Sequence, residues 1–86
     1  MDKETTTSKI KTFLARQFPL TKNVGNNEPL LKNGLIDSLG ILEVVTFVEN
    51  EFGIVVSDEE LVPDNFGSVH SVANFVQVKT RSSANA

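Results

Sequence analysis

Residues 36–53, which read IDSLGILEVVTFVENEFG, carry the clearest structural signal in the sequence. Asp37 is a good helix N-cap, because its carboxylate can accept hydrogen bonds from the free backbone N–H groups of a first turn. Ile36 and Ile41 stand at the two positions of a hydrophobic staple around this cap, and Gly53 is a typical stop at the C-terminal end. The stretch therefore predicts one long, well-capped helix.

The predicted helix has two faces when its residues are spaced at about 100°. One broad arc is apolar and should face the core; it consists of Ile41, Val44, Val45, Val48 and Phe52. Leu39 lies on the opposite side, in the first turn and next to Ser38. A lone exposed leucine is common and needs no functional explanation. At this position, contact with a partner protein is the alternative interpretation.

Helical periodicity also marks the N-terminal segment. Apolar residues recur there at helical spacing: Ile10, Phe13, Leu14 and Phe18. They predict a helix that begins at Thr5 or Ser8 and ends at Gln17, before a proline. The loop that follows, residues 20–36, is long, and loops of this length are uncommon without a function.

Two more helices are predicted in the C-terminal half. Residues 57–60, Ser-Asp-Glu-Glu, have the spacing of a capping box and predict a short helix that Pro63 limits. Ser68 is the expected cap of a last helix, in which apolar residues repeat at helical spacing: Val69, Val72, Ala73 and Val76. Residues 80–86 are mostly small and polar and are expected to form a tail. Because no segment shows sustained strand alternation, the predicted fold class is all-α: a small four-helix bundle of three longer helices and one short one.

The composition excludes several classes of function. The chain has 86 residues, which predicts a single domain over residues 1–86, ordered from about 5 to 79, and too small to build a deep substrate cavity. The formal net charge of −3 argues against nucleic acid as a partner and favours partners with basic patches. There are no cysteines, which excludes disulfides, zinc–thiolate sites and cysteine nucleophiles. The sequence contains no apolar leader and no run long enough to span a membrane, so we expect a cytoplasmic monomer.

Ser38 occupies the first helical position if Asp37 is the cap. Its hydroxyl would then face solvent at the positive end of the helix dipole, where free N–H groups favour a phosphodiester. A serine in a first turn is ordinarily a capping or solubilising residue. The geometry therefore suits a phosphate-bearing serine without requiring one.

An ordered set of motifs runs through the sequence: Gly-Leu-Ile-Asp-Ser-Leu at 34–39, Glu43, Phe-Gly-Ile at 52–54 and Asp-Glu-Glu-Leu at 58–61. This set resembles the acyl carrier protein family, which includes peptidyl carrier domains. The resemblance extends from the first helix into the last. It implies a four-helix bundle in which Ser38 carries 4'-phosphopantetheine, transferred from coenzyme A by a phosphopantetheinyl transferase. It also implies that acyl or aminoacyl groups are held as thioesters on this arm, and that the protein is not an enzyme.

The acidic residues around Ser38 suggest where partner enzymes dock. Between Asn33 and Val78 the sequence has no Lys or Arg, whereas acidic residues recur throughout. Such a stretch would steer the basic surfaces of acyl- or aminoacyl-loading and processing enzymes toward the serine, although a charge run is otherwise simply a solvated face. The expected docking residues are Asp37, Leu39, Glu43, Asp58, Glu59 and Glu60.

Two positions depart from the pattern of fatty-acid-type carriers. Those carriers usually have an acidic residue directly after Asp-Ser-Leu, where this sequence has Gly40, and often a second one where Asn50 stands. The departures weaken the expectation of docking to fatty acid synthase enzymes. Residues 61–66, LVPDNF, are more similar to stand-alone carriers of specialised pathways. Fatty-acid, polyketide and nonribosomal-type pathways stay open, including the alternative of a stand-alone aminoacyl or peptidyl carrier.

Other functions fit the sequence less well. A nucleophilic triad of Ser38, His70 and an aspartate would need hydrogen-bond geometry and an oxyanion hole, and His70 belongs to a different helix. The acidic residues of segment 58–64 lack the alternate ligand spacing of a calcium loop, so no metal is expected: Asp58, Glu59, Glu60 and Asp64. Four apolar residues are candidates for the lining of an acyl cleft, and we interpret them as core: Ile41, Val44, Phe47 and Val48. The alternative from another class is an unmodified acidic helical module that only binds partner proteins.

Overall fold

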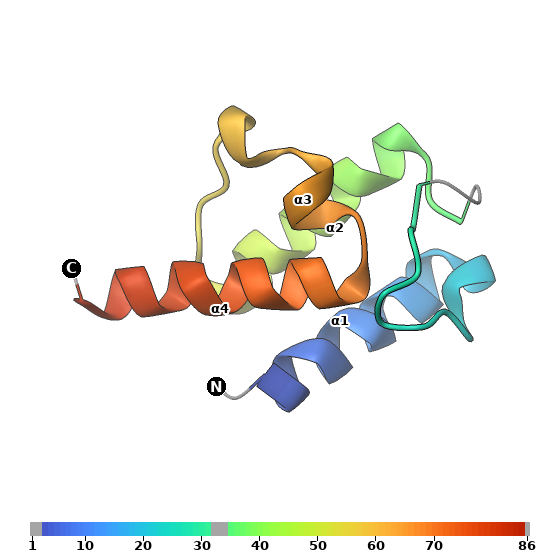
Figure 1. The fold of residues 1–86 in the computed structure, drawn as a ribbon, viewed down its shortest axis with the longest axis horizontal. Helices are drawn as coiled ribbons and strands as arrows, with labels where there is room; N and C mark the ends of the chain where they lie inside the picture. Colours follow the sequence, from blue (N-terminus) through green and yellow to red (C-terminus); the bar gives the residue numbers. More distant parts are fainter. Residues whose placement is uncertain (1–2, 32–34, 86) are drawn as a thin grey trace.

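The computed structural model describes residues 3–31 and 35–85, without the side chains of residues 3, 38 and 82–85. Within these ranges the chain forms helices and no β-strand. The helices are α1 (Lys3–Gln17), α2 (Ser38–Phe52), α3 (Pro63–Phe66) and α4 (Val69–Asn85), with 3₁₀ turns η1 (Pro19–Thr21) and η2 (Asp58–Glu60). The prediction of an all-α bundle with three longer helices and one short one is confirmed (Figure 1).

Helix α2 begins and ends where its caps predict. The Asp37 side chain accepts a hydrogen bond from the Gly40 N–H at 2.7 Å, and the Asp37 backbone is extended (φ −89°, ψ 178°). At the other end Gly53 is left-handed (φ 66°, ψ 36°), and its N–H donates to the Glu49 carbonyl. Glycine adopts this conformation without the steric cost of a Cβ. These local signals fix both ends of the helix that carries residue 38.

The core is one contiguous apolar cluster that draws on α1, α2, α4 and the loops between them. Its fully buried members include Ile10, Leu14, Val44, Val48, Val72 and Val76. Helix α4 packs against both α1 and α3 (Figure 1). The long loop before α2 contributes the buried residues Leu30 and Ile36, and the Leu30 N–H donates to the Gly67 carbonyl at 2.8 Å. The loop is therefore tied to the core at the point where it leads into α2.

Helix α1 begins at Lys3, before the Thr5 or Ser8 start that the sequence suggested. The threonine run is a poor helix interior on propensity alone. Here Thr6 is fully buried, and its hydroxyl accepts a hydrogen bond from the Gln77 side chain of α4 at 2.9 Å. A tertiary contact that sequence reasoning does not see thus holds the first turn.

The C-terminal half also differs in detail from the prediction. The capping box at Ser57 is present, but it opens a 3₁₀ turn and not an α-helix. The short α-helix is α3, and Pro63 begins it, because a first helical position needs no N–H donor. Helix α4 continues to Asn85, so the helix extends into the segment that was expected to be a tail.

Candidate functional site

Residue 38 stands at the head of α2 between two exposed neighbours. Ser38 is the first residue of the helix, and its side chain lies outside the described part of the structure. Asp37 is exposed, and 74% of the Leu39 surface is open to solvent. The outward position that the sequence predicts for Leu39 is confirmed. The chain therefore presents both flanks of residue 38 at its surface.

The predicted cap of α2 is confirmed. The Asp37 carboxylate accepts a hydrogen bond from the Gly40 N–H, one of the free donors of the first turn. A carboxylate at an N-terminus is itself favoured by the helix dipole. The first turn is thus held in place by the protein's own carboxylate.

A contact that sequence reasoning missed lies on the α1 side of the same turn. Gly40 is buried, and a Cβ at this position would lie 2.6 Å from Ile36 Cγ2 and 2.9 Å from Phe18 Cε1. A side chain at position 40 would have to displace the side chains of Ile36 and of Phe18, the residue that follows α1. No local pattern reveals this contact, since Phe18 and Gly40 lie far apart in the sequence.

The carboxylates of α2 are not equally available for docking. Glu49 accepts a hydrogen bond from the Val56 N–H at 2.9 Å, and Glu51 pairs with Lys9 of α1 at 3.0 Å. Glu43 is exposed and has no hydrogen-bond or ion-pair partner among the described residues. Of the three, Glu43 is therefore the one whose carboxylate is open to a partner.

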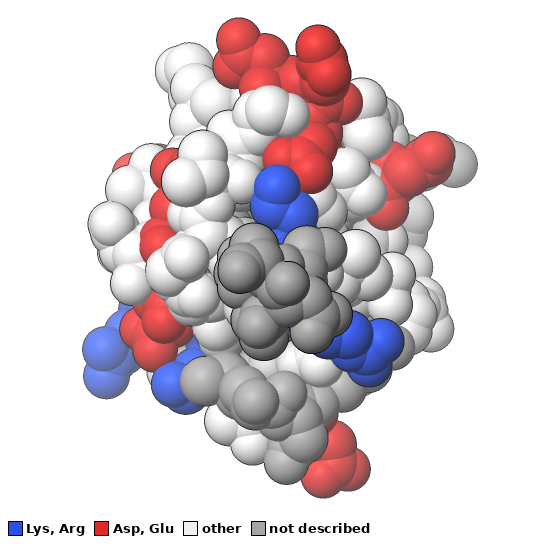
Figure 2. Space-filling view, turned by 90° about the vertical axis from the view of Figure 1, so that its left-hand side faces the viewer, with Lys and Arg blue, Asp and Glu red and all other residues white. Residues whose placement is uncertain are grey.

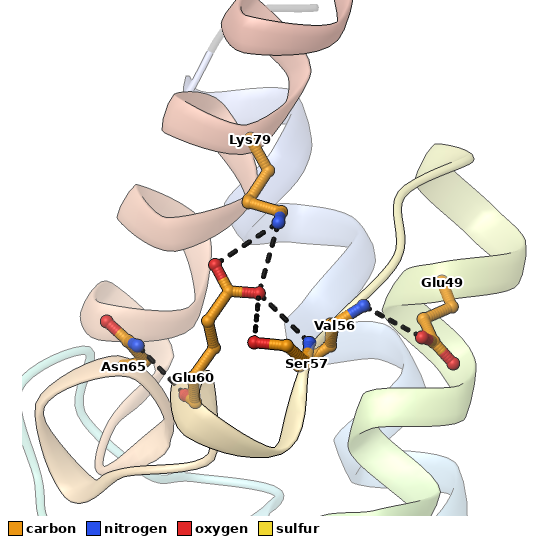
Figure 3. Close-up of polar contacts among 6 residues, drawn as sticks. All are labelled: Glu49, Val56, Ser57, Glu60, Asn65 and Lys79. Carbon is orange, nitrogen blue, oxygen red and sulfur yellow. Dashed lines mark hydrogen bonds and ion pairs between the residues drawn. The ribbon is translucent and has the colours of Figure 1, made fainter.

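Glu60 is engaged inside the molecule (Figure 3). Its carboxylate accepts hydrogen bonds from the Ser57 N–H at 3.0 Å and the Ser57 hydroxyl at 3.2 Å. Lys79 of α4 reaches both of its oxygens, at 3.0 and 3.2 Å. The hydrogen bond from the Ser57 backbone, followed by the contact with Lys79, lowers the pKa of Glu60. The neighbouring Asp58 and Glu59 are exposed instead.

The acidic surface has a clear place on the molecule. Figure 2 shows Asp and Glu side chains gathered at the upper end of the face, over η2, with Lys and Arg side chains mainly below them. The exposed acidic residues of η2 and α3 are Asp58, Glu59 and Asp64. Their density supports a surface that attracts basic partners.

The described residues give little support to the other sites considered from the sequence, a nucleophilic triad with His70 and a metal site. His70 is exposed, and it lies in an open hollow with α1 residues such as Glu4 and Lys11, which contains no aspartate. Among the described side chains, no three of His, Asp and Glu are placed to share a metal ion. Over the same part of the chain, every helix is too short or too polar to cross a bilayer.

A small apolar hollow lies between the long loop, α2 and α3. Its volume is about 90 Å³, and it is lined by Leu31, Ile41, Leu61, Val62, Pro63 and Phe66. Val44 and Val48 are fully buried in the core, as expected from the helix wheel. Of the apolar residues considered for a cleft, Ile41 is the one that faces this hollow.

The chain is a small helical bundle, and its second long helix begins at a serine between an aspartate cap and an exposed leucine. This arrangement is typical of a carrier domain. No protein-family model matches the chain. An acyl carrier protein of Buchnera aphidicola is 39% identical over 70 residues, covering 80% of this chain and 87% of that protein. An acyl carrier protein homolog of Mycoplasmopsis pulmonis is 36% identical over 73 residues, with 84% and 97% covered. A probable acyl carrier protein of Serratia, PigG, is 31% identical over 72 residues, with 81% and 83% covered. The chain belongs to the acyl carrier protein family.

Proposed function

We propose that the chain carries acyl groups on a 4'-phosphopantetheine arm attached to Ser38, in a fatty-acid, polyketide or specialised biosynthetic pathway. The observation that carries the proposal is the position of Ser38: it is the first residue of α2, between exposed neighbours, in a chain related to acyl carrier proteins. When bound, the arm supplies a terminal thiol that holds the cargo as a thioester. An aminoacyl or peptidyl cargo is the alternative within the same role.

The residues around Ser38 fit such an attachment. Asp37 and Leu39 are exposed, so a transferase can approach position 38 from both sides. The hydrogen bond from Gly40 to Asp37 keeps the first turn of α2 formed, which holds the attachment point at a fixed place on the bundle. The sequence contains no cysteine, so no thiol of the chain competes for acyl groups.

Partner enzymes with basic docking surfaces are the second part of the proposal. The carboxylates open to them are Glu43 on α2 and Asp58 and Glu59 on η2. Glu60, which the sequence analysis grouped with them, binds Ser57 and Lys79 instead. We therefore propose that Glu60 shapes the docking surface and that the exposed carboxylates contact the partner.

Phosphopantetheinylation tests the proposal directly. The protein is incubated with coenzyme A, magnesium and a broad-specificity phosphopantetheinyl transferase, and intact mass and free thiol are measured. We expect a mass increase of one arm and one free thiol, both lost in Ser38→Ala. Because the chain has no cysteine, any thiol must belong to the arm.

Ser8→Ala is the matched control, because Ser8 is another exposed serine within a helix. This variant should be modified like the wild type. If the wild type gains no mass while folded, the carrier role is wrong, and an unmodified module that binds partners through its acidic surface becomes the better description.

A further inference from the structure

A second hollow lies on the surface between α1 and α2, apart from the docking residues named above. Its volume is about 300 Å³, and all of its lining residues belong to these two helices. They include Lys9, Phe13 and Arg16 of α1, and Phe47 and Glu51 of α2. The hollow is open to solvent and large enough to receive a side chain of another molecule.

Two half-buried aromatic rings form the apolar part of this hollow. Phe13 and Phe47 stack with their centroids 4.2 Å apart and their planes 12° apart. Phe18 packs edge-on against Phe13 at 6.4 Å, and Phe52 packs edge-on against Phe47 at 6.1 Å. Packing therefore fixes the stacked pair, and part of its surface still lines the hollow. A further aromatic ring that packs against such a pair is stabilised by more than its buried area alone.

The charges around the hollow favour an acidic occupant. Lys9 pairs with Glu51 at 3.0 Å, so these two charges offset each other. Arg16 is exposed and has no hydrogen-bond or ion-pair partner among the described residues, which leaves its guanidinium available at the rim. Helix α1 contains four basic residues and one acidic residue, although the whole chain is acidic. This side of the molecule therefore attracts negatively charged segments.

We propose that the hollow between α1 and α2 is a docking site for an acidic segment of a partner protein. The segment inserts an aromatic side chain against Phe13 and Phe47 and pairs a carboxylate with Arg16. This partner is opposite in charge to the basic enzymes proposed for Glu43, Asp58 and Glu59, so the two surfaces select different proteins.

The site does not depend on the modification of Ser38. Ser38 and Phe47 are nine residues apart in α2, which corresponds to about 13 Å along the helix axis. A short segment bound in the hollow therefore leaves the head of α2 uncovered. An acidic partner can hold the protein through α1 while an enzyme acts at residue 38.

A peptide titration tests the proposal. The probe is an end-blocked peptide, Glu-Glu-Phe-Glu-Glu, added at low salt to the full ¹⁵N-labelled chain and followed by amide chemical shifts. We expect the shifts to change around Phe13, Arg16 and Phe47 and to stay unchanged around Asp58 and Glu59. Glu-Glu-Ala-Glu-Glu should bind more weakly, and Lys-Lys-Phe-Lys-Lys should leave the hollow unperturbed. If the acidic peptide perturbs no residue of the hollow, or the alanine peptide binds equally well, the site is wrong.

Substitutions separate a defined site from general charge attraction. Arg16→Gln should raise the Kd of the acidic peptide by about fivefold, as expected for one ion pair at a rim. Arg81→Gln removes the same charge from an exposed position of α4 and should leave the Kd unchanged. Phe13→Ala should raise the Kd further, and Phe13→Leu, which keeps an apolar side chain, replaces it if the alanine variant does not fold. Equal weakening by Arg16→Gln and Arg81→Gln would overturn the site.

Two further measurements distinguish the occupant and the function. A second copy of the chain is the other possible occupant, because its own surface is acidic. Dilution without peptide should leave the amide shifts unchanged, and a concentration-dependent change at the hollow would replace the acidic partner by self-association. Ser38→Ala should bind the peptide like the wild type, and Arg16→Gln should be phosphopantetheinylated like the wild type. The carrier role and the docking site can therefore fail independently.

Discussion

Asp37 connects the stability of α2 to the placement of residue 38. The first N–H groups of a helix have no partner within the helix, and the Asp37 side chain accepts one of them, from Gly40, at 2.7 Å. The same residue is extended and exposed, and Ser38 follows it directly. A single side chain thus fixes where the helix starts and where the attachment point stands.

Replacing this cap should have a measurable cost. Asp37→Ala is expected to lower the free energy of unfolding by about 1 kcal/mol, because the Gly40 N–H loses its acceptor. Asp37→Asn keeps an acceptor oxygen and should cost much less. Equilibrium urea unfolding measures both variants. A loss of the same size in Asp37→Asn would show that the negative charge matters and not the cap.

At the scale of elements, the connection between α2 and α3 is held by two carboxylates (Figure 3). Glu49 of α2 binds the Val56 N–H, and Glu60 of η2 binds Ser57 and Lys79 of α4. The Asn65 side chain also donates to the Glu60 carbonyl at 2.9 Å. The connection includes only one 3₁₀ turn, so these side chains supply hydrogen-bond partners that a longer helix would provide internally.

The Glu60 contacts predict a pH-dependent contribution to stability. The hydrogen bond from Ser57 and the contact with Lys79 lower the pKa of Glu60 in the folded state. The ionised carboxylate therefore stabilises the fold at pH values above the ordinary glutamate pKa, about 4.3, and this contribution is lost as the pH falls through the lower folded value. In thermal unfolding, the wild type should be more stable than Glu60→Gln at neutral pH, and the difference should shrink below about pH 4.

Glu59→Gln is the control for this experiment. Glu59 belongs to the same 3₁₀ turn but is exposed and has no hydrogen-bond partner among the described residues. It should not reproduce the pH-dependent loss. If the difference in thermal stability between the wild type and Glu60→Gln stays constant down to strongly acidic pH, the shape of the Glu60 side chain, and not its charge, holds the turn.

The elements differ in how far they could be predicted from the sequence. Both ends of α2 and the capping box at Ser57 follow from residues within a few positions of each other, and these local signals were sufficient. The early start of α1 depends on Thr6 and Gln77, which meet only in the fold. The approach of Phe18 to Gly40 and the pairing of Glu60 with Lys79 depend in the same way on contacts between distant residues.

At the scale of the whole molecule, the charges are separated along the chain. Helix α1 contains half of the eight Lys and Arg residues: Lys3, Lys9, Lys11 and Arg16. Residues 33–78 contain none, and the exposed carboxylates of α2 and η2 fall within that range. Figure 2 shows a group of acidic side chains at the upper end of the face, and further acidic side chains elsewhere on it. A basic partner is therefore attracted to one part of the molecule more than its modest net charge suggests.

This separation predicts that the position of a charge matters more than the net charge. Glu43→Lys and Glu4→Lys each change the formal net charge from −3 by two units, but Glu43 lies on α2 and Glu4 on α1. With a basic loading enzyme at low salt, Glu43→Lys should lower kcat/KM several-fold, by about 3- to 10-fold, and Glu4→Lys should change it little. High salt should remove the difference. Because both residues are exposed, the free energy of unfolding of each variant should lie within about 0.5 kcal/mol of the wild-type value. Equal kcat/KM values for the two variants would show that the enzyme responds to total charge. If Glu43→Lys lowers the free energy of unfolding by as much as it raises the activation free energy, the loss of kcat/KM is due to a damaged fold.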